Sequence, residues 1–212
     1  MNIIINSFKF LIDLFYGITG DFGIAIVLIT IIVKLILLPF SIKQRIAMKK
    51  QINFSKKIEE VKNRYKNNKK KQEEEVRKLY SQSPKGLLGC LIPILQLPII
   101  SGLYMTINRL QVEAITILVP WAISIGNSDD KFVVPLLYTL ITVAPSIISY
   151  FNIFGNDENH ISIKSILPMI IFGLVMTIKA PIALGIYFIT SSLFTLIEDI
   201  GFRLYSKNKV FV

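Results

Sequence analysis

The chain has 212 residues, 52% of them hydrophobic, and a mean hydropathy of +0.57. Soluble domains are usually about 45–50% apolar, so this composition excludes an ordinary soluble globular domain. The net charge of +10 suggests nucleic-acid binding at first sight, but the charge is concentrated in one segment, which is described below. The only cysteine, Cys90, excludes a disulfide within the chain, and with the distant His160 it makes a poor metal site. We therefore expect neither a metal nor a cofactor.

Five apolar stretches predict membrane-spanning helices, because about 20 residues are needed to cross a hydrocarbon core about 30 Å thick. The stretches are Phe22–Phe40, Gly86–Leu110, Phe132–Phe151, Ser165–Ile178 and Ala183–Ile197, the last extended to residue 200. Pro181 in the short link 179–182 separates the last two into a hairpin, since proline interrupts a helix. Residues 1–21 lack the basic start and the small-residue cleavage site of a signal peptide, so we expect them to be retained. The predicted fold is an all-α bundle of five transmembrane helices.

The basic residues predict how the bundle is oriented. Residues 41–85 carry 15 Lys or Arg against 5 Glu, and such segments stay on the cytoplasmic side during insertion. Alternation places residues 1–21, 111–131 and 179–182 outside, and residues 152–164 and the basic tail 201–212 inside. The positive face favours anionic lipid headgroups or a ribosome over direct, specific binding of nucleic acid.

The basic segment 41–85 is also patterned as two helices. Phe54, Ile58, Val61 and Tyr65 recur at helical spacing, and a turn near Asn68 precedes a second helical stretch. The pattern predicts a cytoplasmic helical hairpin. It is either a passive link between two spans or a mobile arm that meets incoming chains or partner proteins.

Lys34 is the residue that most requires an explanation. It lies about 9 Å inside the predicted first span, where a lysine costs about 2.5–3.5 kcal/mol on insertion scales. One interpretation is that its long side chain reaches back to the headgroups. The other is that it faces a wet cavity, where its charge would attract acidic or polar parts of another chain. Thr30, four residues earlier, shares its helical face.

Further polar groups occur within the predicted spans. Hydroxyls of Ser101, Thr142 and Ser146 usually bond to backbone carbonyls or neighbouring helices in membranes. The amide of Gln96 needs more partners, and Pro93 and Pro98 on either side loosen its helix. The sequence contains no nucleophile elbow, phosphate-binding glycine loop or intramembrane pair of acids, so we do not expect an enzyme.

Two stretches carry a resemblance to a known family. The first runs from Tyr16-Gly-Ile-Thr-Gly-Asp21 through Lys34-Leu-Ile-Leu-Leu-Pro39 to Gln44. The second, more specific, stretch runs from Pro84 through Gly89-Cys90 and Gln96-Leu-Pro98 to Tyr104. Together with weaker matches up to the last span, they resemble the YidC-type membrane protein insertases in their short bacterial form, which are related to the mitochondrial and chloroplast insertases.

The resemblance implies a hydrophilic groove, open to the cytoplasm and lipid, that receives the hydrophilic segment of a client. Lys34, Thr30 and Phe188 match groove positions of the family, and Gln96, Ser101, Thr142 and Ser146 complete the predicted site. It also implies a bacterial plasma membrane protein whose partners are nascent membrane proteins, the ribosome and, in some cases, the Sec translocon. This chain departs from the family in having lysine for arginine at position 34 and Glu198-Asp199 for a glutamine pair.

Two alternatives remain open from the sequence. A membrane chaperone or assembly factor would use the same groove without inserting clients by itself. A small transporter or channel is disfavoured because the chain has neither duplicated halves nor a matched pair of broken helices.

Overall fold

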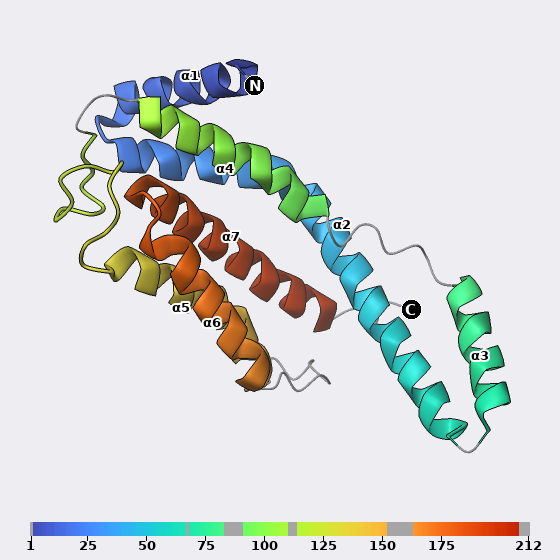
Figure 1. The fold of residues 1–212 in the computed structure, drawn as a ribbon. Coiled ribbons are helices and arrows are strands. Elements are labelled where there is room, and N and C mark those ends of the chain that lie inside the picture. The colour runs from blue at the N-terminus through green and yellow to red at the C-terminus, as the bar shows by residue number, and fades with distance from the viewer. Residues whose placement is uncertain (1, 67, 83–90, 110–113, 152–162, 208–212) are drawn as a thin grey trace. The chain divides into compact units, whose positions relative to one another are not determined.

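The computed structural model describes residues 2–66, 68–82, 91–109, 114–151 and 163–207, and within these residues it is all-helical, as predicted (Figure 1). The helices are α1 (Asn2–Thr19), α2 (Phe22–Arg64), α3 (Lys69–Gln82), α4 (Leu91–Arg109), α5 (Val133–Tyr150), α6 (Ile163–Ile178) and α7 (Ile182–Lys207). The link before α7 contains Pro181, where the sequence predicts a break between the last two apolar helices.

Within the residues that the structure describes, three helices are long and apolar enough to cross a membrane, namely α2, α5 and α7. Shorter apolar helical stretches lie at Gln96–Ile107 and Ile166–Ile178, within the second and fourth predicted spans. The beginning of the second predicted span, residues 86–90, falls outside the described residues. The membrane character of the fold is therefore confirmed, while the count of five spans stays a prediction.

The chain divides into two compact units, residues 37–97 and the remainder, 1–36 with 98–212. In residues 37–97, the second half of α2 and α3 form a helical hairpin. The rings of Phe54 and Tyr80 meet edge to face with centroids 5.6 Å apart, and the Gln72 side chain donates to the Lys62 carbonyl at 2.8 Å. Ile58 is buried beside this contact.

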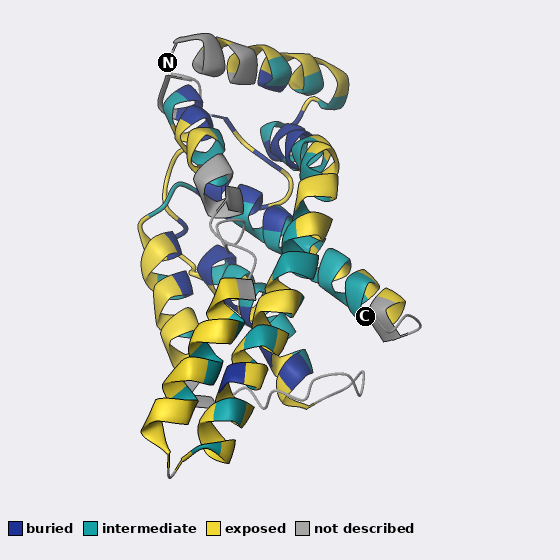
Figure 2. Ribbon diagram, turned by 90° about the vertical axis from the view of Figure 1, so that its right-hand side faces the viewer, coloured by how far each residue is buried: buried dark blue, intermediate teal, exposed yellow. Residues whose placement is uncertain are grey.

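The other unit has a small apolar core and an apolar surface. Its core includes Ile26, Ile29, Leu103, Val134, Ala183 and Ile186 from α2, α4, α5 and α7. Figure 2 shows by colour that many residues on its helices are exposed. On α2, α5 and α6 the exposed residues include many large apolar ones. They include Ile32, Leu35, Ile36, Leu136, Leu137, Leu140, Leu167, Ile171, Phe172 and Val175. A contiguous apolar exterior of this extent is typical of a protein surrounded by lipid.

A buried carboxylate joins the start of α2 to the loop 114–132. Gly20, in the left-handed region with φ 68°, ends α1, and Asp21 then caps α2 by accepting the N–H of Ile24 at 2.8 Å. The same carboxylate accepts the Thr116 hydroxyl at 2.8 Å and the Ile117 N–H at 2.7 Å. Burial acts to raise the pKa of Asp21, but these hydrogen bonds outweigh burial and hold the pKa below its usual value.

The same loop also fastens to the starts of α5 and α7. Asp129 accepts the N–H of Val134 at 2.7 Å and the indole N–H of Trp121 at 2.8 Å. Burial acts to raise the pKa of Asp129, and its hydrogen bonds lower it further than burial raises it. The first N–H groups of α7, those of Ile182 and Ala183, donate to carbonyls of loop residues 127 and 125 at 2.8 and 2.9 Å. One loop therefore closes the end of the bundle where α2, α5 and α7 begin (Figure 1).

Candidate functional site

Lys34 lies on α2 at about the same depth as Thr195 on α7. Its ammonium donates to the Thr195 hydroxyl across a 3.1 Å contact, and that hydroxyl donates in turn to the Ser191 carbonyl at 2.8 Å. The Lys34 side chain is half-buried. The contact joins residues 161 positions apart, so the lysine directs its charge toward α7, inside the bundle, and not only along its own helix.

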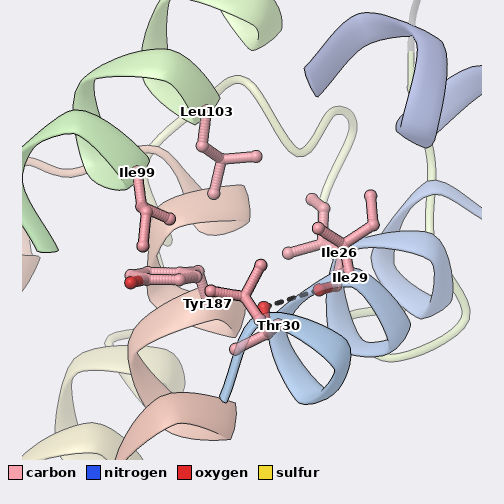
Figure 3. Close-up of a pocket in the computed structure, with 7 residues that line it drawn as sticks. Ile26, Ile29, Thr30, Ile99, Leu103 and Tyr187 are labelled. Atoms are coloured by element: carbon pink, nitrogen blue, oxygen red, sulfur yellow. Dashed lines mark hydrogen bonds between the residues drawn. The ribbon is translucent and has the colours of Figure 1, made fainter. Parts of the chain in front are cut away.

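Thr30 lines a small apolar cavity one turn before Lys34. The cavity is partly open to the outside and is lined by Ile26, Ile29, Thr30, Val33, Ile99, Leu103 and Tyr187. Figure 3 shows Ile99 and Leu103 of α4 next to the ring of Tyr187, with Thr30 on the α2 side. The Thr30 hydroxyl donates to the Ile26 carbonyl at 2.6 Å. Thr30 therefore contributes a methyl group to the wall, and the hydroxyl that receives the lysine is that of Thr195.

The predicted site residues of α5 meet α7 and α6. The hydroxyls of Thr142 and Ser192 are 3.4 Å apart, and Ser192 lies one turn before Thr195 on α7. Ser146 donates to the sulfur of Met169 on α6 at 3.6 Å. The ring of Phe188 packs against Tyr138 of α5 at 5.3 Å. Thus α7 presents hydroxyls both to the lysine of α2 and to the polar residues of α5.

Ser101 is not brought into this arrangement, and Gln96 belongs to a different compact unit. Ser101 is exposed on α4 and donates to the Pro98 carbonyl at 3.1 Å. Gln96 belongs to the unit of residues 37–97, separate from the unit that contains Lys34. The structure therefore places Lys34, Thr30, Thr142 and Phe188 next to or on α7, Ser146 against α6, and Ser101 apart from these residues.

Sequence reasoning missed Tyr187 and Thr195. The resemblance pointed to Phe188, yet the neighbouring Tyr187 lines the cavity while Phe188 faces α5. Adjacent residues of a helix point about 100° apart, so a shift of one position changes the partner helix. The position of Thr195 could have been noticed from the sequence, because it follows Ser191 by one helical turn and extends a row of hydroxyl residues along the last predicted span.

Arg203 belongs to the predicted basic tail of residues 201–212. It lies within α7, where it pairs with Asp199 at 2.6 Å and donates to the Ser149 hydroxyl of α5 at 2.8 Å. Only 17% and 16% of the Arg203 and Asp199 side chains are exposed. The contact ties the far ends of α5 and α7 together.

The chemistry available at this site is non-covalent. A half-buried ammonium, several hydroxyls and apolar walls can receive a polar or acidic segment through hydrogen bonds and charge attraction. In the part of the chain that the structure describes, no group of three His, Cys, Asp or Glu side chains is placed to hold a metal ion.

Comparisons with known proteins identify the family of the chain. A family model described as "60Kd inner membrane protein" matches residues 14–209. The membrane protein insertase YidC 1 of Listeria monocytogenes serotype 4b is 32% identical over 195 residues, covering 90% of this chain and 67% of that protein. YidC of Caldanaerobacter subterraneus subsp. tengcongensis is 29% identical over 200 residues, covering 93% and 92%.

A solved structure agrees as well. The crystal structure of an active YidC insertase with its first transmembrane domain resolved is similar at a TM-score of 0.66 and 25% identity. The match covers 92% of this chain and 45% of that one, so the chain corresponds to less than half of that protein's length.

The fold and the site define an all-helical membrane protein that brings a lysine and several hydroxyls together around one apolar helix. The family match covers most of the chain, and relatives at about one-third identity cover most of it too. The chain belongs to the 60Kd inner membrane protein family, the family of the YidC insertases.

Proposed function

We propose that this protein is a membrane protein insertase of the bacterial plasma membrane. The observation that carries the proposal is the contact of Lys34 with Thr195, which directs a charged group into the bundle beside a set of hydroxyls. The names of its relatives, membrane protein insertases, support the same function. The hydrophilic tail of a client would lie transiently near Lys34 and α7 while the apolar segment of the client moves into lipid.

The energy for such insertion comes from the client. Burial of apolar surface yields about 25 cal/mol per Å², which is ample for a segment of about 20 residues. The protein would only lower the cost of moving a short polar tail through the hydrocarbon. No covalent step and no cofactor are needed, and the protein is proposed not to be an enzyme.

The proposed topology has five spans, with residues 1–21 outside and the C-terminal end in the cytoplasm. The basic hairpin of residues 41–85 then faces the cytoplasm, where it would meet the ribosome and anionic lipid headgroups. Nascent membrane proteins are the proposed clients, and the Sec translocon is a proposed partner for some of them.

The proposal is tested with proteoliposomes that contain only this purified protein and a single-span client with a short acidic tail. Protease protection of the tail is expected. Lys34→Ala should reduce protection about tenfold, which corresponds to about 1.4 kcal/mol of lost stabilisation, whereas Lys34→Arg should retain it. Lys179→Ala, which removes an exposed lysine, is the matched control.

The outcomes separate the remaining alternatives. A bound client without protection would favour a chaperone or assembly factor that depends on another insertase. Equal protection with Lys34→Ala and Lys34→Arg would exclude the role of the charge but not insertion itself. Thr195→Val, which removes the hydroxyl partner and keeps the charge, should have a smaller effect than Lys34→Ala.

A further inference from the structure

The loop 114–132 displays large apolar side chains outward although its backbone is held firmly. Ile115, Ile117 and Ile123 are 65%, 72% and 76% exposed, while Ala114, Thr116 and Ile125 are nearly fully buried. No residue from Ala114 to Ile125 is charged. Apolar side chains of this size are unfavourable in water, so a segment that presents them together requires a non-aqueous neighbour.

The outward face cannot turn inward without breaking the contacts that hold the loop. The Ile117 N–H is bound by the buried Asp21 carboxylate, and the Thr116 hydroxyl is bound beside it. Gly23 permits this close approach, because a Cβ at position 23 would overlap the Thr116 side chain. The exposure of Ile115 and Ile117 on either side of Thr116 therefore follows from the fixed backbone.

The position of the loop indicates which neighbour covers this face. The loop lies at the end of the bundle where α2, α5 and α7 begin (Figure 1). Phe132, half-exposed, leads directly into α5, whose first turns expose Leu136 and Leu140 to lipid. The exposed face of the loop is thus continuous with the apolar exterior of the spans. In addition, α5 has 18 residues and measures about 27 Å, slightly less than a hydrocarbon core of about 30 Å. A loop at its first residue therefore lies at the boundary between headgroups and acyl chains, where its outward apolar side chains can reach the acyl chains.

We propose that the face formed by Ile115, Ile117, Leu118 and Ile123 inserts among the acyl chains of the leaflet at this end of the bundle. In the proposed topology this is the outer leaflet, and only that assignment depends on the proposed function. Trp121 marks the boundary of the inserted face. Its indole N–H binds Asp129, and the Lys131 ammonium lies 5.7 Å from its ring centroid, as suits an aromatic residue at headgroup level.

Insertion of this face, which we call the wedge, would set how deeply the bundle lies in the bilayer. Asp21, Asp129 and the loop carbonyls connect it to the first turns of α2, α5 and α7. Because α2 is a continuous helix, the depth of its first residue fixes the depth of Lys34, which lies about 18 Å further along the helix axis. The wedge would thereby hold the ammonium at a fixed level in the bilayer.

The test uses Trp121, the only tryptophan of the chain. The full-length protein is placed in liposomes whose lipids carry bromine on the acyl chains, and Trp121 fluorescence is compared with that in unbrominated liposomes. We expect at least a twofold loss of fluorescence. Ile117→Asp with Ile123→Asp should reverse most of the quenching, and Ser128→Asp, an exposed site in the same loop, should leave it unchanged.

A second measurement keeps the proposal falsifiable should the double variant fail to fold. In a Cys90→Ser background, Ile123→Cys carries an environment-sensitive fluorophore, whose emission should shift to the blue in liposomes. Emission as in water, absent quenching of Trp121, or quenching unchanged in a folded double variant would each overturn the proposal. No client takes part, so failure of the insertase assay and failure of this proposal are distinguishable.

Discussion

Replacement of Asp21 tests whether one buried carboxylate holds the end of the bundle together. Asp21→Ala removes the cap of α2 and both hydrogen bonds to the loop, those from Thr116 and Ile117. A helix cap contributes about 1 kcal/mol, and a hydrogen bond to a charged group about 1.5–3 kcal/mol. Together these contributions reach about 4–7 kcal/mol. Because water can enter part of the vacated space and bind the freed donors, we expect a smaller loss of about 3 kcal/mol.

The loss should appear in thermal unfolding of the purified protein in detergent. For a chain of about 150–250 residues, 1 kcal/mol corresponds to about 2–4 °C, so the midpoint should fall by about 6–12 °C. Trp121 fluorescence reports the loop itself, and circular dichroism reports the helices. The loop transition should move at least as far as the helical one, since two of the three lost bonds end in the loop.

Two variants make the result decisive. Asp130→Ala removes an exposed carboxylate in the same loop and should change the midpoint little. Asp21→Asn keeps one acceptor oxygen but turns an NH₂ group toward a donor. Its unfolding midpoint should therefore lie between those of Asp21→Ala and the unchanged protein. If Asp21→Ala and Asp130→Ala unfolded at the same temperature, the buried carboxylate would not hold the loop and the reasoning would be refuted.

Three further predictions concern packing, the hairpin and acid. Gly185→Ala should lower the free energy of unfolding by about 1–3 kcal/mol, because its Cβ would overlap the Val134 side chain. Adding Val134→Ala should restore part of the melting temperature. A double variant that melts below Gly185→Ala alone would contradict this explanation. Tyr80→Ala removes the ring contact of the hairpin and should speed hydrogen exchange in residues 37–97 only, with no change expected in the rest of the chain. The lowered pKa values of Asp21 and Asp129 mean that their stabilisation is complete above about pH 4 and is lost as pH falls through the folded-state values. The melting temperature should therefore decline as the pH is lowered below about 4, and the decline should be smaller in Asp21→Asn. An identical decline in both proteins would argue against a contribution from the Asp21 carboxylate.

The membrane character of the fold could be predicted because it depends on local properties. Apolar runs of the right length identified α2, α5 and α7, and Pro181 identified the break before α7, since each needs only neighbouring residues. The basic hairpin followed from helical spacing around Phe54. The exact number of spans depends on shorter helices that composition alone does not decide.

The details of the site could not be predicted because they depend on contacts between distant parts of the chain. Lys34 stood out as a costly charge in an apolar run, but its partner Thr195 lies 161 residues away. Asp21 appeared only as part of a familiar motif, and its bonds to Thr116 and Ile117 arise from the way the loop returns to α2. That Tyr187 lines the cavity while Phe188 contacts α5 shows the same limit, because the rotation of α7 about its axis is set by packing against distant helices.

The attachment of the loop to α7 has a consequence for how sequences of this kind can diverge. The N–H groups of Ile182 and Ala183 are received by main-chain carbonyls of residues 127 and 125, and every amino acid supplies a carbonyl there. Substitutions at position 127, whose side chain is exposed, can therefore accumulate without moving the loop. Positions 21 and 129 have no such freedom, because their side chains make the bonds. Related proteins can thus keep the same loop path while position 127 varies, provided that the aspartates at 21 and 129 and the glycines at 20 and 23 remain.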